Sequence, residues 1–221
     1  INLIRLFINI LYCVYGWCCS AFEEPKMNRQ ISIIIMLMVI LSGCQLRDQE
    51  RYKPRAIKLH NQAFDLMKEK RYDSAMVLLR KALEIDESYY QIHQNIIDIY
   101  LDRKEYQNAI DEAEIVIQKK PDLAEGWFFA GILNEYRGNK EIARKYYQKS
   151  IELFTERIND PQKQKNIDAN VLNRALSKKF VGDSSYIIDL NDLINKEEYS
   201  FTANMVLNNT KDEIIEEIIY D

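Results

Sequence analysis

The same pattern occurs three times along this chain. Residues 70–86 read KRYDSAMVLLRKALEID, residues 104–120 read KEYQNAIDEAEIVIQKK, and residues 138–154 read GNKEIARKYYQKSIELF. The stretches start 34 residues apart and align without a gap. Each keeps an alanine at its sixth position: Ala75, Ala109 and Ala143. A fixed period of this length predicts stacked structural units that each contact mainly their neighbours.

Other positions recur with the same period and with helical spacing. For the three units in turn they are Leu59, His93 and Trp127; Ala63, Ile97 and Gly131; Leu79, Ala113 and Tyr147; and Ala82, Val116 and Ser150. Apolar residues three and four apart form one stripe of an amphipathic helix. The recurring alanines remove bulk where two antiparallel helices approach within about 8 to 10 Å. The pattern therefore predicts paired helices.

This period and pattern resemble the tetratricopeptide repeat family. The resemblance implies an all-α fold, a right-handed solenoid of helix hairpins with about three repeats in residues 55–155. The family pattern is broken at four places: Glu87 and Thr155 replace a proline, Ile97 replaces a small residue, and Lys140 replaces an aromatic residue. The alanine phase is intact in all three units, so these departures weaken single units only.

Residues 156–221 are expected to form a degenerate fourth hairpin and a C-terminal cap, because terminal repeats are usually atypical. The third unit's second helix should run to about Asn159, where Asp160 and Pro161 break it. Residues 171–194 read as two further helices with a turn at Gly182. Thr210 and a glutamate three residues later predict a capping box before the last apolar run.

The N-terminal part has the pattern of a targeting segment. Residues 27–43 combine a basic start, the apolar run ISIIIMLMVIL and a small-residue exit, which is typical of a secretory signal peptide. The ending LSGC resembles the lipobox of bacterial lipoproteins, which implies lipid attachment to Cys44 and cleavage before it. A plain cleavable signal or an uncleaved anchor is the alternative. Residues 1–26 are interpreted as mistranslated upstream sequence and residues 44–54 as a tether.

Composition and motifs argue against several functions. A net charge of -4, with scattered lysines and arginines, gives no reason to expect nucleic-acid binding. The remaining cysteines, Cys13, Cys18 and Cys19, precede the folded part, so neither a disulfide framework nor a metal site is predicted. The chain has no phosphate-binding glycine loop, zinc-binding HExxH or GxSxG motif. We predict a protein that is not an enzyme and uses no cofactor.

The resemblance implies that a partner binds the inner face of each repeat's first helix. We define the inner face by nine positions, three from each repeat: His60, Phe64 and Met67; Gln94, Asp98 and Leu101; and Phe128, Ile132 and Glu135. An amphipathic helix or extended segment with basic and apolar residues would suit them. The alternative is that these apolar residues are core, covered by the C-terminal segment.

One subset of the family clamps a C-terminal carboxylate with basic and amide side chains. The matching places here hold His60, Phe64, Asn95, Glu125 and Phe129, and only Asn95 fits. The basic clamp is therefore absent. We predict a lipid-anchored adaptor that binds a protein or peptide in the cell envelope, at the outer membrane facing the periplasm. The alternative is a non-catalytic subunit or ligand-binding lipoprotein of an envelope enzyme or transport system.

Overall fold

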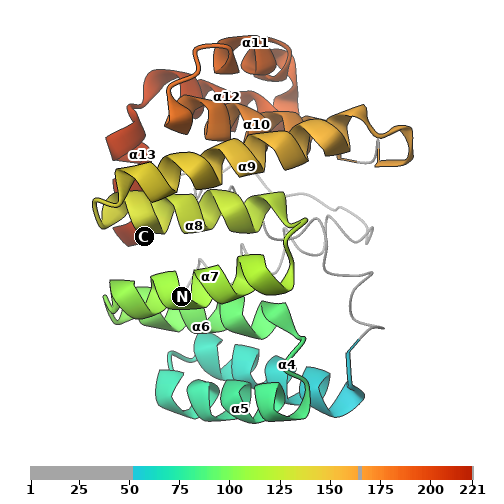
Figure 1. The fold of residues 1–221 in the computed structure, drawn as a ribbon, viewed down its shortest axis with the longest axis vertical. Helices are drawn as coiled ribbons and strands as arrows, with labels where there is room; N and C mark the ends of the chain where they lie inside the picture. The colour runs from blue at the N-terminus through green and yellow to red at the C-terminus, as the bar shows by residue number, and fades with distance from the viewer. Residues whose placement is uncertain (1–51, 164–165, 221) are drawn as a thin grey trace, which may run out of the picture.

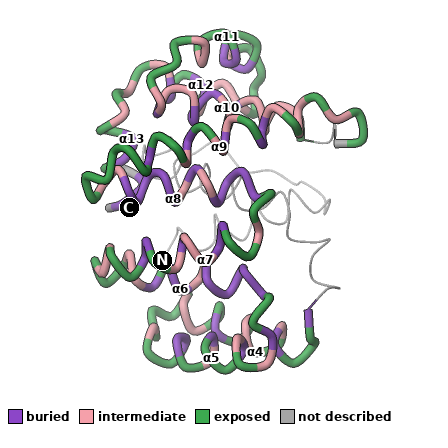
Figure 2. Tube along the Cα trace, viewed as in Figure 1, coloured by how far each residue is buried: buried purple, intermediate pink, exposed green. Residues whose placement is uncertain are grey.

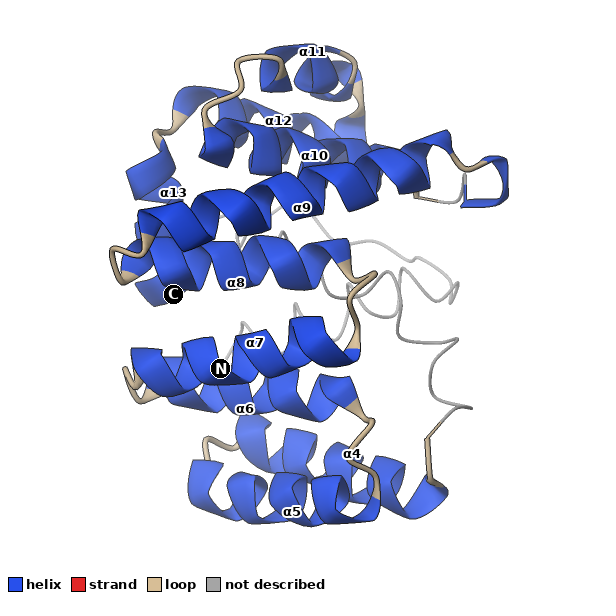
Figure 3. Cartoon of the chain, in the orientation of Figure 1, coloured by secondary structure: helices blue, strands red, loops and turns tan. Residues whose placement is uncertain are grey.

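The computed structural model describes residues 52–163 and 166–220, and this part of the chain contains helices and turns but no strand. The predicted signal peptide, Cys44 and most of the predicted tether lie outside the described residues. Consecutive helices pack side by side into a stack of hairpins, with the repeats at one end and the C-terminal helices at the other (Figures 1 and 3). This confirms the predicted all-α fold built from helix hairpins.

Six helices form three hairpins. They are α4 (Pro54–Lys68) with α5 (Tyr72–Ile85), α6 (Tyr90–Asp102) with α7 (Tyr106–Lys119), and α8 (Ala124–Tyr136) with α9 (Lys140–Asn159). We call the first helix of each hairpin its A helix and the second its B helix. The three B helices start at residues 72, 106 and 140, so the helices follow the 34-residue period of the sequence.

The turn inside each hairpin is the same Schellman motif. Lys70, Lys104 and Gly138 have φ angles of 58°, 59° and 87°, which is the left-handed region. In the second turn, Lys104 N–H donates to the Leu101 carbonyl at 2.9 Å and Glu105 N–H donates to the Tyr100 carbonyl at 2.8 Å. These bonds satisfy carbonyls that the helix end leaves free.

The recurring small residues lie where the paired helices meet. Ala75, Ala109 and Ala143 are each at most 1% exposed. At Gly131 an added Cβ would lie 2.5 Å from a ring carbon of Tyr147. The equivalent pairs in the other repeats are Ala63 with Leu79 and Ile97 with Ala113, and all four residues are buried. The departure at Ile97 is thus matched by a small partner on its B helix.

The third B helix is longer than the other two. Thr155 stands where the family has proline, and its hydroxyl donates to the Ile151 carbonyl at 2.7 Å inside α9. The helix continues past this position to Asn159 and ends before Asp160 and Pro161, as the sequence predicts.

The C-terminal part repeats the hairpin turn once more. After η2 (Pro161–Lys163) it contains α10 (Ile167–Val181), α11 (Tyr186–Asn191), η3 (Leu193–Asn195), α12 (Glu197–Asn208) and α13 (Lys211–Tyr220). Gly182 has a φ of 86°, and Asp183 N–H donates to the Lys178 carbonyl at 2.9 Å. The predicted capping box is confirmed, because Glu213 N–H donates to the Thr210 hydroxyl at 3.3 Å.

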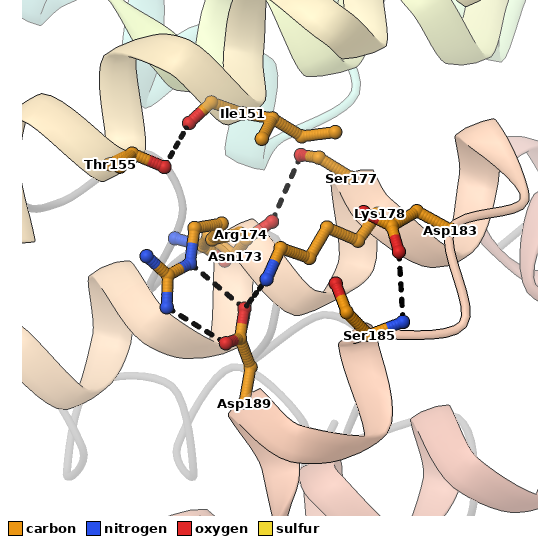
Figure 4. Close-up of polar contacts among 9 residues, drawn as sticks. All are labelled: Ile151, Thr155, Asn173, Arg174, Ser177, Lys178, Asp183, Ser185 and Asp189. Atoms are coloured by element: carbon orange, nitrogen blue, oxygen red, sulfur yellow. Dashed lines mark hydrogen bonds and ion pairs between the residues drawn. The ribbon is translucent and has the colours of Figure 1, made fainter.

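A buried ion cluster fixes α11 against α10. Arg174 donates twice to the Asp189 carboxylate, at 2.8 Å each, and the Lys178 ammonium lies 3.0 Å from it (Figure 4). On the other side of α10, the Ser177 and Ser150 hydroxyl oxygens are 3.0 Å apart at the crossing with α9. The serine contact attaches α10 to the third repeat, and the ion cluster attaches α11 to α10.

The described part begins with the last three residues of the predicted tether, 52–54. Tyr52 is 6% exposed and stacks on Tyr89, with ring centroids 4.1 Å apart. The Lys53 backbone N–H donates to the Asp86 carboxylate at 2.9 Å. Packing on the first repeat thus starts no later than Tyr52.

Candidate functional site

The inner face of the first two repeats reaches solvent. Phe64 is 44% exposed, and the Lys68 ammonium lies 4.5 Å from the centroid of its ring. Asp98, at the same position of the second repeat, is also exposed. The other four residues of these two repeats are half-buried: His60, Met67, Gln94 and Leu101. Six of the nine predicted positions are therefore at least partly exposed, all on the A helices of the first two repeats. The third A helix, α8, is by contrast mostly buried (Figure 2).

His60 is held in a polar network between the two repeats. Its Nδ1 lies 2.9 Å from the Tyr89 hydroxyl oxygen, and its Nε2 lies 2.8 Å from the Asn95 amide nitrogen. A neutral imidazole serves both contacts, because one ring nitrogen donates and the other accepts. Burial lowers the pKa of His60 to about 4. The imidazole is therefore neutral at physiological pH and acts as an orienting polar group.

Asp98 belongs to a small acidic group at the edge of this face. Asp102, one helical turn on, accepts a hydrogen bond from the Tyr72 hydroxyl at 3.1 Å. Burial, then the neighbouring Asp102 and Asp98, raise the pKa of Tyr72. Desolvation by the surrounding protein raises the pKa of the Asp98 carboxyl to about 6, although its side chain still reaches water. Because Asp98 is exposed, a partner can reach its carboxylate. With a pKa of about 6, this carboxylate is mostly ionised at pH 7.

The third repeat presents a different surface at the same positions. Phe128 is 1% exposed and Ile132 is fully buried. The Phe128 ring meets the Phe180 ring of α10 edge-on, with centroids 5.2 Å apart. Glu135 accepts a hydrogen bond from the Tyr147 hydroxyl at 2.8 Å and forms an ion pair with Lys211 of α13. Residues from α10 and α13 therefore cover this part of the inner face.

The positions that would carry a carboxylate clamp have structural partners instead. Asn95 contacts His60, as described above. Glu125 is 6% exposed and forms an ion pair of 2.6 Å with Arg157 of α9. Phe129 is half-buried. Together these side chains give no cationic site for a terminal carboxylate.

The comparisons with known proteins agree with this geometry. Residues 66–127 match the tetratricopeptide repeat family. The matched segment is therefore similar to tetratricopeptide repeats over rather more than a quarter of the chain. The match spans the end of the first A helix, the whole first B helix, the second repeat and the start of the third A helix. Tetratricopeptide repeats are protein-binding modules, so the chain has the architecture of an interaction scaffold.

A segment of 82 residues is also 28% identical to the "Heat shock protein sti1 homolog" of Schizosaccharomyces pombe. That segment is 37% of this chain and 14% of the yeast protein. The chain thus spans about a seventh of the relative's length. The similarity supports the repeat architecture over that segment.

Sequence reasoning did not identify three residues that shape this surface. Tyr52 and Tyr89 support His60, and Lys211 binds Glu135. Tyr89 precedes an A helix and Tyr52 precedes the first repeat, where the 34-residue pattern carries no information. Lys211 directly follows the capping Thr210. This position predicted the start of a helix, but it did not predict that Lys211 would pair with Glu135.

The described residues also bear on membrane spans and metal sites. None of the helices in residues 52–163 and 166–220 is long and apolar enough to cross a membrane. Within the same ranges, no three His, Cys, Asp or Glu side chains gather in a way that could hold a metal ion.

Proposed function

We propose that this protein is a lipid-anchored adaptor of the cell envelope that holds a protein or peptide partner on the inner face of its first two repeats. One observation carries the proposal. Phe64 and Asp98 are exposed, whereas Ile132, at the same position of the third repeat, is fully buried. A face that is left open next to one that is covered is available to a separate chain.

The residues on the open face favour one chemistry in the partner. Phe64 offers an aromatic surface, and Asp98 and Asp102 are exposed carboxylates one turn apart. A segment with apolar residues and at least one lysine or arginine complements both features. The absence of a cationic clamp at the matching positions argues against a partner held by its terminal carboxylate.

Capture from detergent-solubilised membranes tests the surface. Phe64→Ala and Asp98→Lys should each reduce capture of the partner at least tenfold, while the melting temperature stays close to that of the parent. Val77→Ala is the matched control, because Val77 is 52% exposed but lies on the first B helix. Equal capture by all three variants would show that the partner does not use this face. Co-purification of an enzyme or transporter whose activity needs this chain would favour a subunit role.

The lipid anchor rests on the sequence around Cys44. Two or more acyl chains, at about 0.8 kcal/mol per buried CH₂, hold a protein stably at a membrane, whereas one chain is marginal. Intact-mass analysis of the membrane-purified protein should find Cys44 as the first residue and carrying lipid. An unmodified thiol, or residues before Cys44, would contradict the anchor. Cys44→Ser should leave the precursor unprocessed by the lipoprotein pathway.

The location of the anchor is tested separately. We propose the outer membrane, with the repeats facing the periplasm. Membrane fractionation should then place the protein with outer-membrane markers, and protease added to intact cells should leave it uncut. Cleavage in intact cells would place the repeats on the outside.

A further inference from the structure

The described chain contains an ammonium-binding site that none of the functions above uses. Lys211, the first residue of α13, places its Nζ 2.5 Å from the Glu135 carboxylate of α8. The same Nζ donates to the Phe180 carbonyl of α10 at 2.6 Å. It also lies 5.4 Å from the centroid of the Tyr147 ring and 5.6 Å from that of Phe180. One ammonium thus meets a carboxylate, a carbonyl and two aromatic rings.

Contacts that do not involve Lys211 also hold the site together. The Tyr147 hydroxyl donates to the second carboxylate oxygen of Glu135 at 2.8 Å. Burial and the charge of Glu135 raise the pKa of Tyr147, so the phenol stays a neutral donor. The Tyr147 and Phe180 rings contact each other edge-on, with centroids 5.3 Å apart. A carboxylate held beside two packed aromatic rings is the chemistry that binds a lysine or another alkylammonium group.

The segment that fills the site, α13, is an amphipathic helix of the kind that binds grooves of other proteins. The α13 helix has ten residues and is the last described helix. One side of it is buried and aliphatic: Ile214, Ile215, Ile218 and Ile219. The opposite side carries exposed carboxylates, including Asp212 and Glu216. Amphipathic helices with this pattern bind grooves of other proteins through their apolar side.

The site also lies at a position where a partner is expected. Glu135 occupies the same place in its repeat as Met67 and Leu101, which remain half-buried on the open inner face. In Figure 1, α13 passes behind one end of α9 and α8, and its first residue contacts Glu135 of α8. The site therefore occupies the third repeat's share of the inner-face positions, after the two repeats whose positions remain partly exposed.

We infer that Glu135, Tyr147 and Phe180 form a lysine-binding site and that α13 is an internal ligand, which competes there with a lysine-bearing aliphatic helix of the partner. The competition rests on the proposed function, but the site and its internal occupant do not. Tethering keeps α13 at a high effective concentration, so the site is closed to weak ligands in the unmodified chain.

A labelled peptide covering residues 209–221 tests the inference on the full chain by fluorescence anisotropy. Ile215→Asp puts a charge on the buried side of α13 and should release the tethered helix. The peptide should bind this variant at least tenfold more tightly than it binds the parent chain. Glu216→Gln is the matched control, because it changes an exposed residue of the same helix. Equal binding to the parent and to Ile215→Asp would overturn the inference.

The role of the ammonium group is tested in the same assay. A peptide in which Lys211 is replaced by Met should bind the Ile215→Asp chain at least tenfold more weakly. Glu135→Gln, added to Ile215→Asp, should weaken binding of the unchanged peptide in the same way. Full affinity in either case would show that the isoleucines alone hold α13.

Hydrogen exchange separates an internal ligand from an integral core helix. In Ile215→Asp, amides of α13 should lose protection while those of α8, α9 and α10 keep it. Loss of protection throughout the third repeat would also overturn the inference. Neither assay uses the envelope partner, so failure of the proposed function, measured with Phe64 and Asp98 variants, gives a different result.

Discussion

The second and third repeats place side chains at the same three inner positions, but the surroundings of these side chains differ. Gln94, Asp98 and Leu101 of the second repeat lie on the open face. Phe128 and Ile132 of the third repeat are buried, and Glu135 binds Lys211. The backbone register is identical in the two repeats, so the difference comes from what packs on them later in the chain.

The residue types at the inner positions match whether a later segment covers them. The covered repeat has an aromatic and an aliphatic residue where the open repeats have His60, Gln94, Phe64 and Asp98. The one polar residue of the covered set, Glu135, has charged and hydroxyl partners for both carboxylate oxygens. Buried charge without such partners would be strongly destabilising.

The largest expected effect comes from truncating a buried aromatic residue of the covered face. Phe128→Ala should lower the free energy of unfolding by about 3–5 kcal/mol, because it leaves a cavity between α8, α9 and α10. Phe64→Ala, on the open face, should change it by at most about 1 kcal/mol. Urea denaturation of both variants measures the contrast. Similar losses would mean that Phe64 is covered in solution.

A smaller effect tests the tight helix crossing of the third repeat. Gly131→Ala should cost about 1–3 kcal/mol, because its Cβ would lie 2.5 Å from the Tyr147 ring. Adding Tyr147→Leu recreates the Ala63 and Leu79 pair of the first repeat and should recover part of the loss. Thermal melting of the single and double variants checks this, and no recovery would show that the three crossings are not equivalent.

His60, in the polar network of the first repeat, should make the stability of the protein depend on pH. Phe128, at the same position of the third repeat, does not titrate and makes no such contribution. The pKa of His60 is about 4 in the folded protein and 6.5 when unfolded. As pH falls from 6.5 to 4, the unfolded chain takes up a proton that native His60 does not, so stability falls. There is no such loss above pH 6.5. Partial exposure limits the expected loss to about 1 kcal/mol.

Replacing the imidazole should remove this pH dependence. The His60→Gln variant, compared with the parent by urea denaturation at several pH values, should lose less stability between pH 6.5 and 4. Taking the difference between the two chains cancels the opposite contribution of Asp98, whose raised pKa of about 6 stabilises the native state as pH falls towards 3.8. Parallel curves for parent and variant would contradict a buried neutral His60.

The smallest expected effect concerns the hairpin turns. Lys104 has a φ of 59°, a conformation that costs an ordinary residue about 1–2 kcal/mol. Lys104→Gly should stabilise the second repeat by less than about 1 kcal/mol, because glycine also increases the entropy of the unfolded chain. Gly138→Ala, at the equivalent turn of the third repeat, should destabilise by about 1 kcal/mol. Melting curves of the two variants should shift in opposite directions.

Much of the repeat architecture could be predicted from the sequence. The recurring alanines placed the helix crossings, and Asp160 and Pro161 placed the end of the third B helix at Asn159. Other elements had no such signal. The helix α12 has a mixed pattern of apolar and polar residues, and the docking of Tyr52 on Tyr89 lies outside the periodic part.

The sequence by itself determined the period, the helix pairs and the register of the inner face, because these depend on contacts between residues a few turns apart that recur in each unit. Only the tertiary structure decided which part of that face is open. Glu135 meets Lys211 and Phe128 meets Phe180 across contacts to α13 and α10, which lie outside the three repeats. A periodic pattern carries no information about contacts that occur once, so the covering of the third repeat had to be seen in three dimensions.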